Sequence, residues 1–170
     1  MGALAALLAV GLGGLGVTLT DVARLYAGLA RGGEIPALVR GLDGGRGAGG
    51  LSIADPVAAW YVADILRGAP PPDNAPAGRI SFKTGTSYGY RDAWAIGFDR
   101  RVTIAVWIGR PDNAAVPGLT GRAAAAPLLF DAFARLGGEP EPVVRPPHAL
   151  LATSATLPPP LRHIRKDQPK

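Results

Sequence analysis

The stretch ISFKTGTSYGYRDAWAIGF, from Ile80 to Phe98, holds the densest group of reactive side chains in this chain of 170 residues. A lysine, several serine and threonine hydroxyls and two tyrosines stand among apolar residues that alternate along the sequence. Such alternation is typical of strands, and the glycine between the tyrosines favours a turn. The stretch therefore predicts a sheet edge at which an active site could be built.

The residues around this stretch predict one antiparallel sheet. Residues 79–86, 93–98 and 102–109 each have a strand pattern. A tight turn is predicted at Asp99 and Arg100, between the last two strands. Because short connections force neighbouring strands to run antiparallel, the three strands should pair in that way.

Two helices are predicted before the strands. The first follows Thr18, because Asp21 stands three residues later, as in a capping box, and apolar residues then recur on one helical face. A pair of glycines after residue 31 should end it. The second follows Asp55, a favoured N-cap residue, with Pro56 in its first turn and Gly68 at its end.

A third helix is predicted from Thr120 to Leu136, and Pro127 should give it a late start or a kink. Beyond this helix the sequence is rich in proline and has no apolar period, which is typical of an extended linker. We therefore expect a packed domain over residues 1–138 and a proline-rich, basic tail over residues 139–170.

The composition favours a single folded domain and excludes several kinds of site. Hydrophobic residues make up 48% of the chain, which is enough for a buried core. The formal charge of +5 is concentrated near the C-terminus without interleaved aromatic residues, so we favour a solvated basic end over a nucleic-acid partner. The chain has no cysteine, and His148 and His163 have no partners at ligand spacing, so no metal site is expected.

Two other segments invite a functional interpretation. The apolar residues 1–19 lack an early lysine or arginine and are interrupted by glycine, so we expect a buried, partly helical segment and no membrane anchor in this chain. The glycine-rich residues 40–50 lack the ending of a phosphate-binding loop, so we expect an exposed loop.

The tripeptide Lys83-Thr84-Gly85 on a strand matches a signature of penicillin-binding proteins and class A β-lactamases. The match extends across KTGTSYGYRDAWAIGF, the upstream GGLGVTLTDVARLYAGLARGG and the downstream IAVWIGR. Over residues 10–137 the chain therefore resembles the C-terminal part of the transpeptidase domain of bifunctional penicillin-binding proteins, of the 1C type. The resemblance implies an α+β fold in which helices pack on an antiparallel sheet, as in the β-lactamase and transpeptidase fold.

The resemblance also implies a function. The family cross-links peptidoglycan stem peptides that end in D-Ala-D-Ala through a serine acyl-enzyme, and β-lactams mimic that terminus. Lys83 would place a positive charge beside the nucleophile and the substrate carboxylate, while the hydroxyls of Thr84 and Thr86 would hydrogen-bond nearby. Gly85 would leave room for a substrate that adds to the strand, and the backbone N–H of Thr86 would donate to the oxyanion.

The site residues that the resemblance implies are accordingly Lys83 and Thr86 for catalysis, and Lys83, Thr84, Gly85 and Thr86 for substrate binding, with no metal or organic cofactor. Three neighbouring residues could shape the rim of the cleft or only pack there: Tyr88, Tyr90 and Arg91. Asp92 and Trp94 are interpreted as a turn ligand and a core anchor.

The family also needs a serine nucleophile in an S-x-x-K motif and a proton-relay S-x-N motif, and the chain contains neither. We therefore expect a fragment that lacks the N-terminal half of its domain and is inactive alone. Its parent would act on the periplasmic side of the bacterial inner membrane. The main alternative is a non-catalytic binding or scaffold remnant of the same fold, and the basic tail leaves a nucleic-acid adaptor as a third hypothesis.

Overall fold

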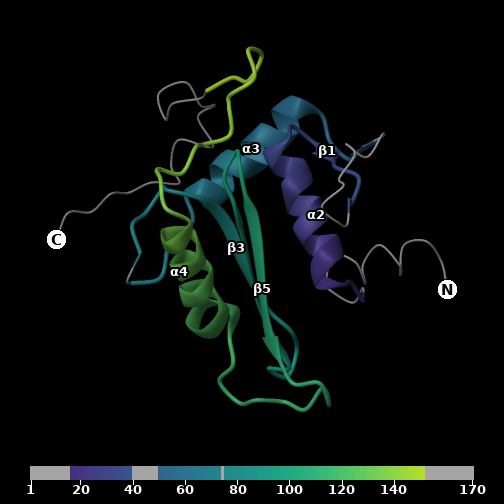
Figure 1. Cartoon of the computed structure of the whole chain (residues 1–170), viewed down its shortest axis with the longest axis vertical. Coiled ribbons are helices and arrows are strands. Elements are labelled where there is room, and N and C mark those ends of the chain that lie inside the picture. The colour runs from purple at the N-terminus through teal and green to yellow at the C-terminus, as the bar shows by residue number, and fades with distance from the viewer. Residues whose placement is uncertain (1–15, 40–49, 74, 152–170) are drawn as a thin grey trace, which may run out of the picture.

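The computed structural model describes residues 16–39, 50–73 and 75–151, which form an α+β fold (Figure 1). The predicted helical segment at the N-terminus, the glycine-rich loop and the basic end of the tail fall largely or wholly outside these residues. No helix among the described residues is both long enough and apolar enough to cross a membrane.

The two helices predicted before the strands are confirmed, with their caps. Helix α2 (Leu19–Ala30) begins at Thr18, whose Oγ1 accepts a hydrogen bond of 3.1 Å from the backbone N–H of Asp21. The Asp21 carboxylate returns to the backbone N–H of Thr18, which completes the capping box. Helix α3 (Pro56–Arg67) begins at Asp55, whose Oδ1 accepts from the N–H of Val57 at 2.8 Å.

The predicted antiparallel sheet is also confirmed. It consists of β3 (Ser81–Thr86), β4 (Asp92–Phe98) and β5 (Thr103–Gly109), in that order. Two strands of two residues each, β1 (Glu34–Ile35) and β2 (Leu51–Ser52), form a second antiparallel sheet that the sequence did not predict, because two residues are too short to show a period.

The turn between β4 and β5 lies one residue later than predicted. Phe98 pairs with Thr103, and Asp99 and Val102 close the turn around Arg100 and Arg101. The Asp99 carboxylate accepts hydrogen bonds from the N–H groups of Arg101 and Val102, at 2.8 and 2.7 Å. Aspartate is favoured as the first residue of such a turn, so its side chain sets the turn's position.

The third helix begins with a π-helical turn, η1 (Gly121–Ala125), and continues as α4 (Ala126–Leu136). Thr120 accepts a hydrogen bond from the N–H of Ala123, as expected of a cap. Pro127 lies in the first turn of α4, where the absent N–H of proline costs nothing. The predicted late start is therefore confirmed, with an irregular turn in front of it.

The helices cover both faces of the three-stranded sheet, and Figure 1 shows α2 and α4 on opposite sides of it. On the α4 face the Phe82 ring packs edge-on against Phe130, with 5.0 Å between ring centroids. On the other face Phe98 packs in the same manner against Tyr26 of α2. The main buried cluster lies on the α4 face and comprises Ile80, Phe82, Ala93, Ala95, Ala125, Ala126 and Leu129.

Residues 139–151 differ from the extended linker that the sequence suggested. Ala149 is only 1% exposed, and the Tyr61 hydroxyl on α3 donates to the carbonyl of Leu150 at 2.7 Å. The Arg145 guanidinium lies over the ring of Trp60, 5.9 Å from its centroid. Packed structure therefore continues beyond Gly138, and the boundary at residue 138 stays a prediction.

Candidate active site

The four residues of the candidate site lie on β3 and divide between the two faces of the sheet. Phe82 contacts α4, whereas the Ser81 hydroxyl donates to the carbonyl of Ala63 in α3 at 2.7 Å. Because side chains alternate along a strand, Lys83 and Gly85 share the α3 face, and Thr84 and Thr86 share the α4 face.

The outer edge of β3 presents backbone groups for binding. Among the described residues β3 pairs only with β4, and the Ser87 N–H donates to the Asp92 carbonyl at 3.0 Å just beyond the strand. Hydrogen-bonded pairs alternate along an antiparallel ladder, so the N–H groups of Thr84 and Thr86 point to the outer edge. The Lys83 ammonium lies at this edge as well, because it donates to the Thr84 carbonyl.

Lys83 carries the positive charge of this edge. Its side chain is exposed, and within the described part of the chain it forms no ion pair. Arg110, at the end of β5, is by contrast held by Asp112 through bonds of 2.9 and 2.6 Å. That pair lowers the pKa of the Asp112 carboxyl. Lys83 therefore remains available to an anionic ligand.

Thr86 links the strand to the start of the third helix. Its Oγ1 accepts a hydrogen bond of 3.0 Å from the backbone N–H of Gly121. A Cβ atom on Gly121 would lie closer than 3.0 Å to the carbonyl oxygens of Gly85 and Trp94, which are directly paired residues of β3 and β4. The first residue of η1 thus lies directly on the β3–β4 ladder, beneath the candidate site.

Gly85 leaves the face beside Lys83 open. An added Cβ there would meet a single atom within 4 Å, the Cβ of Trp94 at 3.6 Å, and Gly85 does not have a positive φ angle. Glycine is therefore not required here by the fold. Its absence of a side chain instead keeps the strand bare on the Lys83 face.

Trp107 was not singled out from the sequence, yet it belongs to this face. It pairs with Trp94 across β4 and β5, with ring centroids 6.4 Å apart, and it is 39% exposed. Its indole N–H donates to the Asp92 carboxylate at 2.9 Å. Trp94 is only half-buried, so it is part of an exposed aromatic pair beside Gly85 and not the core anchor that was expected. Only the register of β4 with β5 brings Trp107 beside Trp94, so no local pattern in the sequence identifies it.

The other rim residues surround the turn after β3. Tyr88 is fully exposed, and Tyr90 has a positive φ of 57°. Asp92 accepts from Trp107 as described and donates its own backbone N–H to the Ser87 hydroxyl at 2.8 Å, in agreement with its interpretation as a turn ligand. No group of three metal-binding side chains occurs in the ranges that the structure describes.

Comparison with known proteins places this chain in a family. No family model matches it. Penicillin-binding protein 1C from Escherichia coli (strain K12) is 42% identical to it over 131 residues, and the match covers 69% of this chain and 16% of that protein. This chain thus spans about one sixth of its relative's length. The identity and the α+β fold agree with the resemblance carried by the Lys-Thr-Gly strand, and the chain belongs to the penicillin-binding protein family.

Proposed function

We propose that this chain supplies the carboxylate-binding and oxyanion-binding strand of a peptidoglycan D,D-transpeptidase. The observation that carries the proposal is the outer edge of β3, where Lys83, which has no ion-pair partner among the described residues, stands beside outward-pointing backbone N–H groups. Support also comes from the similarity to a protein named for binding penicillin.

The edge suits an extended peptide that ends in a carboxylate. Such a peptide adds to β3 as a further strand, because the N–H and C=O groups of Thr84 and Thr86 have no strand partner among the described residues. The Lys83 ammonium attracts the terminal carboxylate, and the Thr86 N–H donates to the oxyanion that develops at the scissile carbonyl. Gly85 keeps side-chain atoms out of the substrate's path.

The threonine side chains have a supporting role in this arrangement. The Thr86 hydroxyl oxygen is occupied by the Gly121 N–H on the α4 face, so it fixes the strand while the Thr86 backbone binds substrate. Thr84 lies on the same α4 face and is half-buried. Lys83 is therefore the one side chain of the tripeptide that reaches the substrate directly.

The serine nucleophile must come from residues outside this sequence, because no serine here has a lysine three residues later. The partners we propose are peptidoglycan stem peptides ending in D-Ala-D-Ala and, in a complete domain, β-lactams. The reaction would take place on the periplasmic side of the inner membrane. The alternative stays a non-catalytic scaffold with the same strand.

A chimera tests this proposal. This chain replaces the matching segment of Escherichia coli penicillin-binding protein 1C, and the rate of covalent labelling by a fluorescent penicillin is measured. The chimera should label, and Lys83→Ala should slow labelling by about 10²- to 10³-fold, as expected when a charge that stabilises the transition state is removed. The 170-residue chain alone should form no adduct.

Matched variants separate a charge effect from misfolding. Lys83→Arg should retain more activity than Lys83→Ala, because it keeps the positive charge. Arg110→Ala, at the end of β5, removes a cation that Asp112 already neutralises and should leave the labelling rate within about threefold. Equal labelling with and without Lys83 in a folded chimera would refute the proposed role and favour the scaffold.

A further inference from the structure

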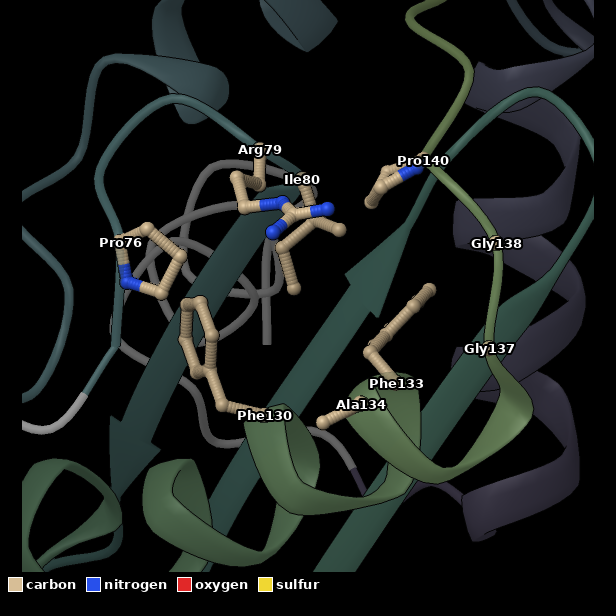
Figure 2. Close-up of a pocket in the computed structure, with 9 residues that line it drawn as sticks. All are labelled: Pro76, Arg79, Ile80, Phe130, Phe133, Ala134, Gly137, Gly138 and Pro140. Carbon is tan, nitrogen blue, oxygen red and sulfur yellow. The ribbon is translucent and has the colours of Figure 1, made fainter.

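A hollow that none of the candidate-site residues lines lies between α4, the start of β3 and the segment that follows α4. Its volume is about 300 Å³, near the lower end of the range for small-molecule sites. Figure 2 shows Phe130 and Phe133 rising from α4 into it, with Ile80 opposite and Arg79 above. The remaining wall residues are Pro76, Ala134, Gly137, Gly138 and Pro140.

Arg79 is the single charged residue in this lining. Its guanidinium forms an ion pair of 2.7 Å with Glu139, whose side chain is 90% exposed, whereas that of Arg79 is 40% exposed. An ion pair with so exposed a partner contributes little to stability, because water competes for both groups. The Glu139 carboxylate can therefore be displaced by another carboxylate at small cost.

We propose that this hollow binds a small free carboxylic acid with an aliphatic body, its chain between the two phenylalanine rings and its carboxylate on Arg79. The walls offer apolar contacts to the body of such a ligand, and the guanidinium matches the planar geometry of a carboxylate. A single cation and an apolar wall do not suit a nucleotide or a sugar, which would need several polar partners. This site is independent of the transpeptidase proposal.

Octanoate and its uncharged analogue octanamide are suitable probes for the 170-residue chain. Isothermal titration should give a dissociation constant for octanoate on the order of 0.1–1 mM, as expected for a ligand of this size, and octanamide should bind about tenfold more weakly. Amide chemical shifts in a ¹⁵N-labelled sample should change around Phe130, Ala134 and Gly138. Absence of saturable octanoate binding up to about 10 mM would overturn the proposal.

Four variants identify the site. Arg79→Gln should weaken octanoate binding about tenfold and leave octanamide unchanged, while Glu139→Gln should strengthen octanoate binding about threefold because it releases Arg79. Ala134→Leu, at an exposed position of α4, partly fills the hollow and should weaken both ligands at least about fivefold. Arg110→Gln is the matched control, since Arg110 is 54% exposed and pairs with Asp112 at 2.6 Å but does not line the hollow.

Each outcome of these measurements either supports or overturns the proposed carboxylate site. Selective loss of octanoate binding in Arg79→Gln, with Arg110→Gln unchanged, supports the proposal. Equal affinity for octanoate and octanamide, or equal weakening by the two arginine variants, would overturn it, because the carboxylate would then not be bound by Arg79. Chemical-shift changes confined to α2 would place binding elsewhere and would also overturn it.

Discussion

Substitution of Gly121 by alanine should push η1 away from the β3–β4 ladder on which it packs. A Cβ at this position would lie inside 3.0 Å of the carbonyl oxygens of Gly85 and Trp94, and 2.9 Å from the nitrogen of Gly85. Ordinary van der Waals contact begins at 3.4 Å. All three atoms belong to a hydrogen-bonded backbone ladder and cannot rotate aside, so η1 must lift from the sheet by about 1 Å.

The cost has two parts. Overpacking of this kind typically destabilises a protein by about 1–3 kcal/mol. The bond between the Gly121 N–H and the Thr86 hydroxyl, 3.0 Å long, would be stretched beyond hydrogen-bonding distance, which adds about 1 kcal/mol. Replacing glycine by alanine offsets about 0.4–1 kcal/mol of this loss, because it lowers the conformational entropy of the unfolded chain. We expect Gly121→Ala to lower the free energy of unfolding by about 1–4 kcal/mol.

Gly85→Ala is the matched control, because it adds the same methyl group to the same backbone pair from the opposite face. Its Cβ would meet only the Trp94 Cβ at 3.6 Å, so it should leave stability unchanged or raise it by up to about 1 kcal/mol. Urea unfolding followed by tryptophan fluorescence and circular dichroism measures both variants. If Gly121→Ala stays within about 0.5 kcal/mol of the parent, the close packing of η1 on β3 is wrong.

Three further predictions concern the remainder of the fold. Burial raises the pKa of the Tyr26 hydroxyl, so above pH 10.0 the folded state keeps a proton that the unfolded chain loses. The free energy of unfolding should therefore fall as the pH rises above this value. Tyr26→Phe should make the fall of melting temperature with pH shallower, and an unchanged slope of melting temperature against pH would contradict this. A chain that ends at Gly138 loses the two backbone hydrogen bonds that Glu141 makes with Asp99 and Arg100, the Tyr61–Leu150 bond and the Arg145–Trp60 contact. The free energy of unfolding should therefore fall by at least about 2–3 kcal/mol, and an unchanged urea midpoint would instead favour the boundary at 138. Apolar side chains exposed on the described surface should bind a hydrophobic dye, and a cooperative thermal transition without dye binding would show an independent domain.

Local signals in the sequence predicted much of the fold. Thr18 and Asp55 cap their helices through contacts with residues two or three positions away, so a short window contains the whole interaction. The alternation around Lys83 likewise predicts which side chains share a face of β3. The strand pattern alone puts the turn after β4 one residue early, because the Asp99 side chain favours the first turn position and so moves the turn to Arg100 and Arg101.

Contacts between distant segments were not predictable in the same way. Gly121 lies 35 residues from Thr86, and nothing near it in the sequence shows that it presses on another backbone. Trp107 belongs to the site only through its register with Trp94. The packing of Ala149 on the body depends on α3, and its proline-rich surroundings resemble those of a linker. Such features depend on tertiary contacts that composition and period do not contain.

Among the described residues β3 lies at the edge of its sheet, and this explains why both of its faces are tied to helices. An edge strand has one sheet neighbour, so half of its backbone groups cannot help to hold it in place. Ser81 fastens β3 to α3 on one face, and Thr86 fastens it to η1 on the other. These two bonds lie at opposite ends of the strand, with Lys83 and Gly85 between them. The outer edge, which has no strand partner among the described residues, can therefore hold the backbone of Lys83 in a fixed position, as the proposed electrostatic role of its side chain requires.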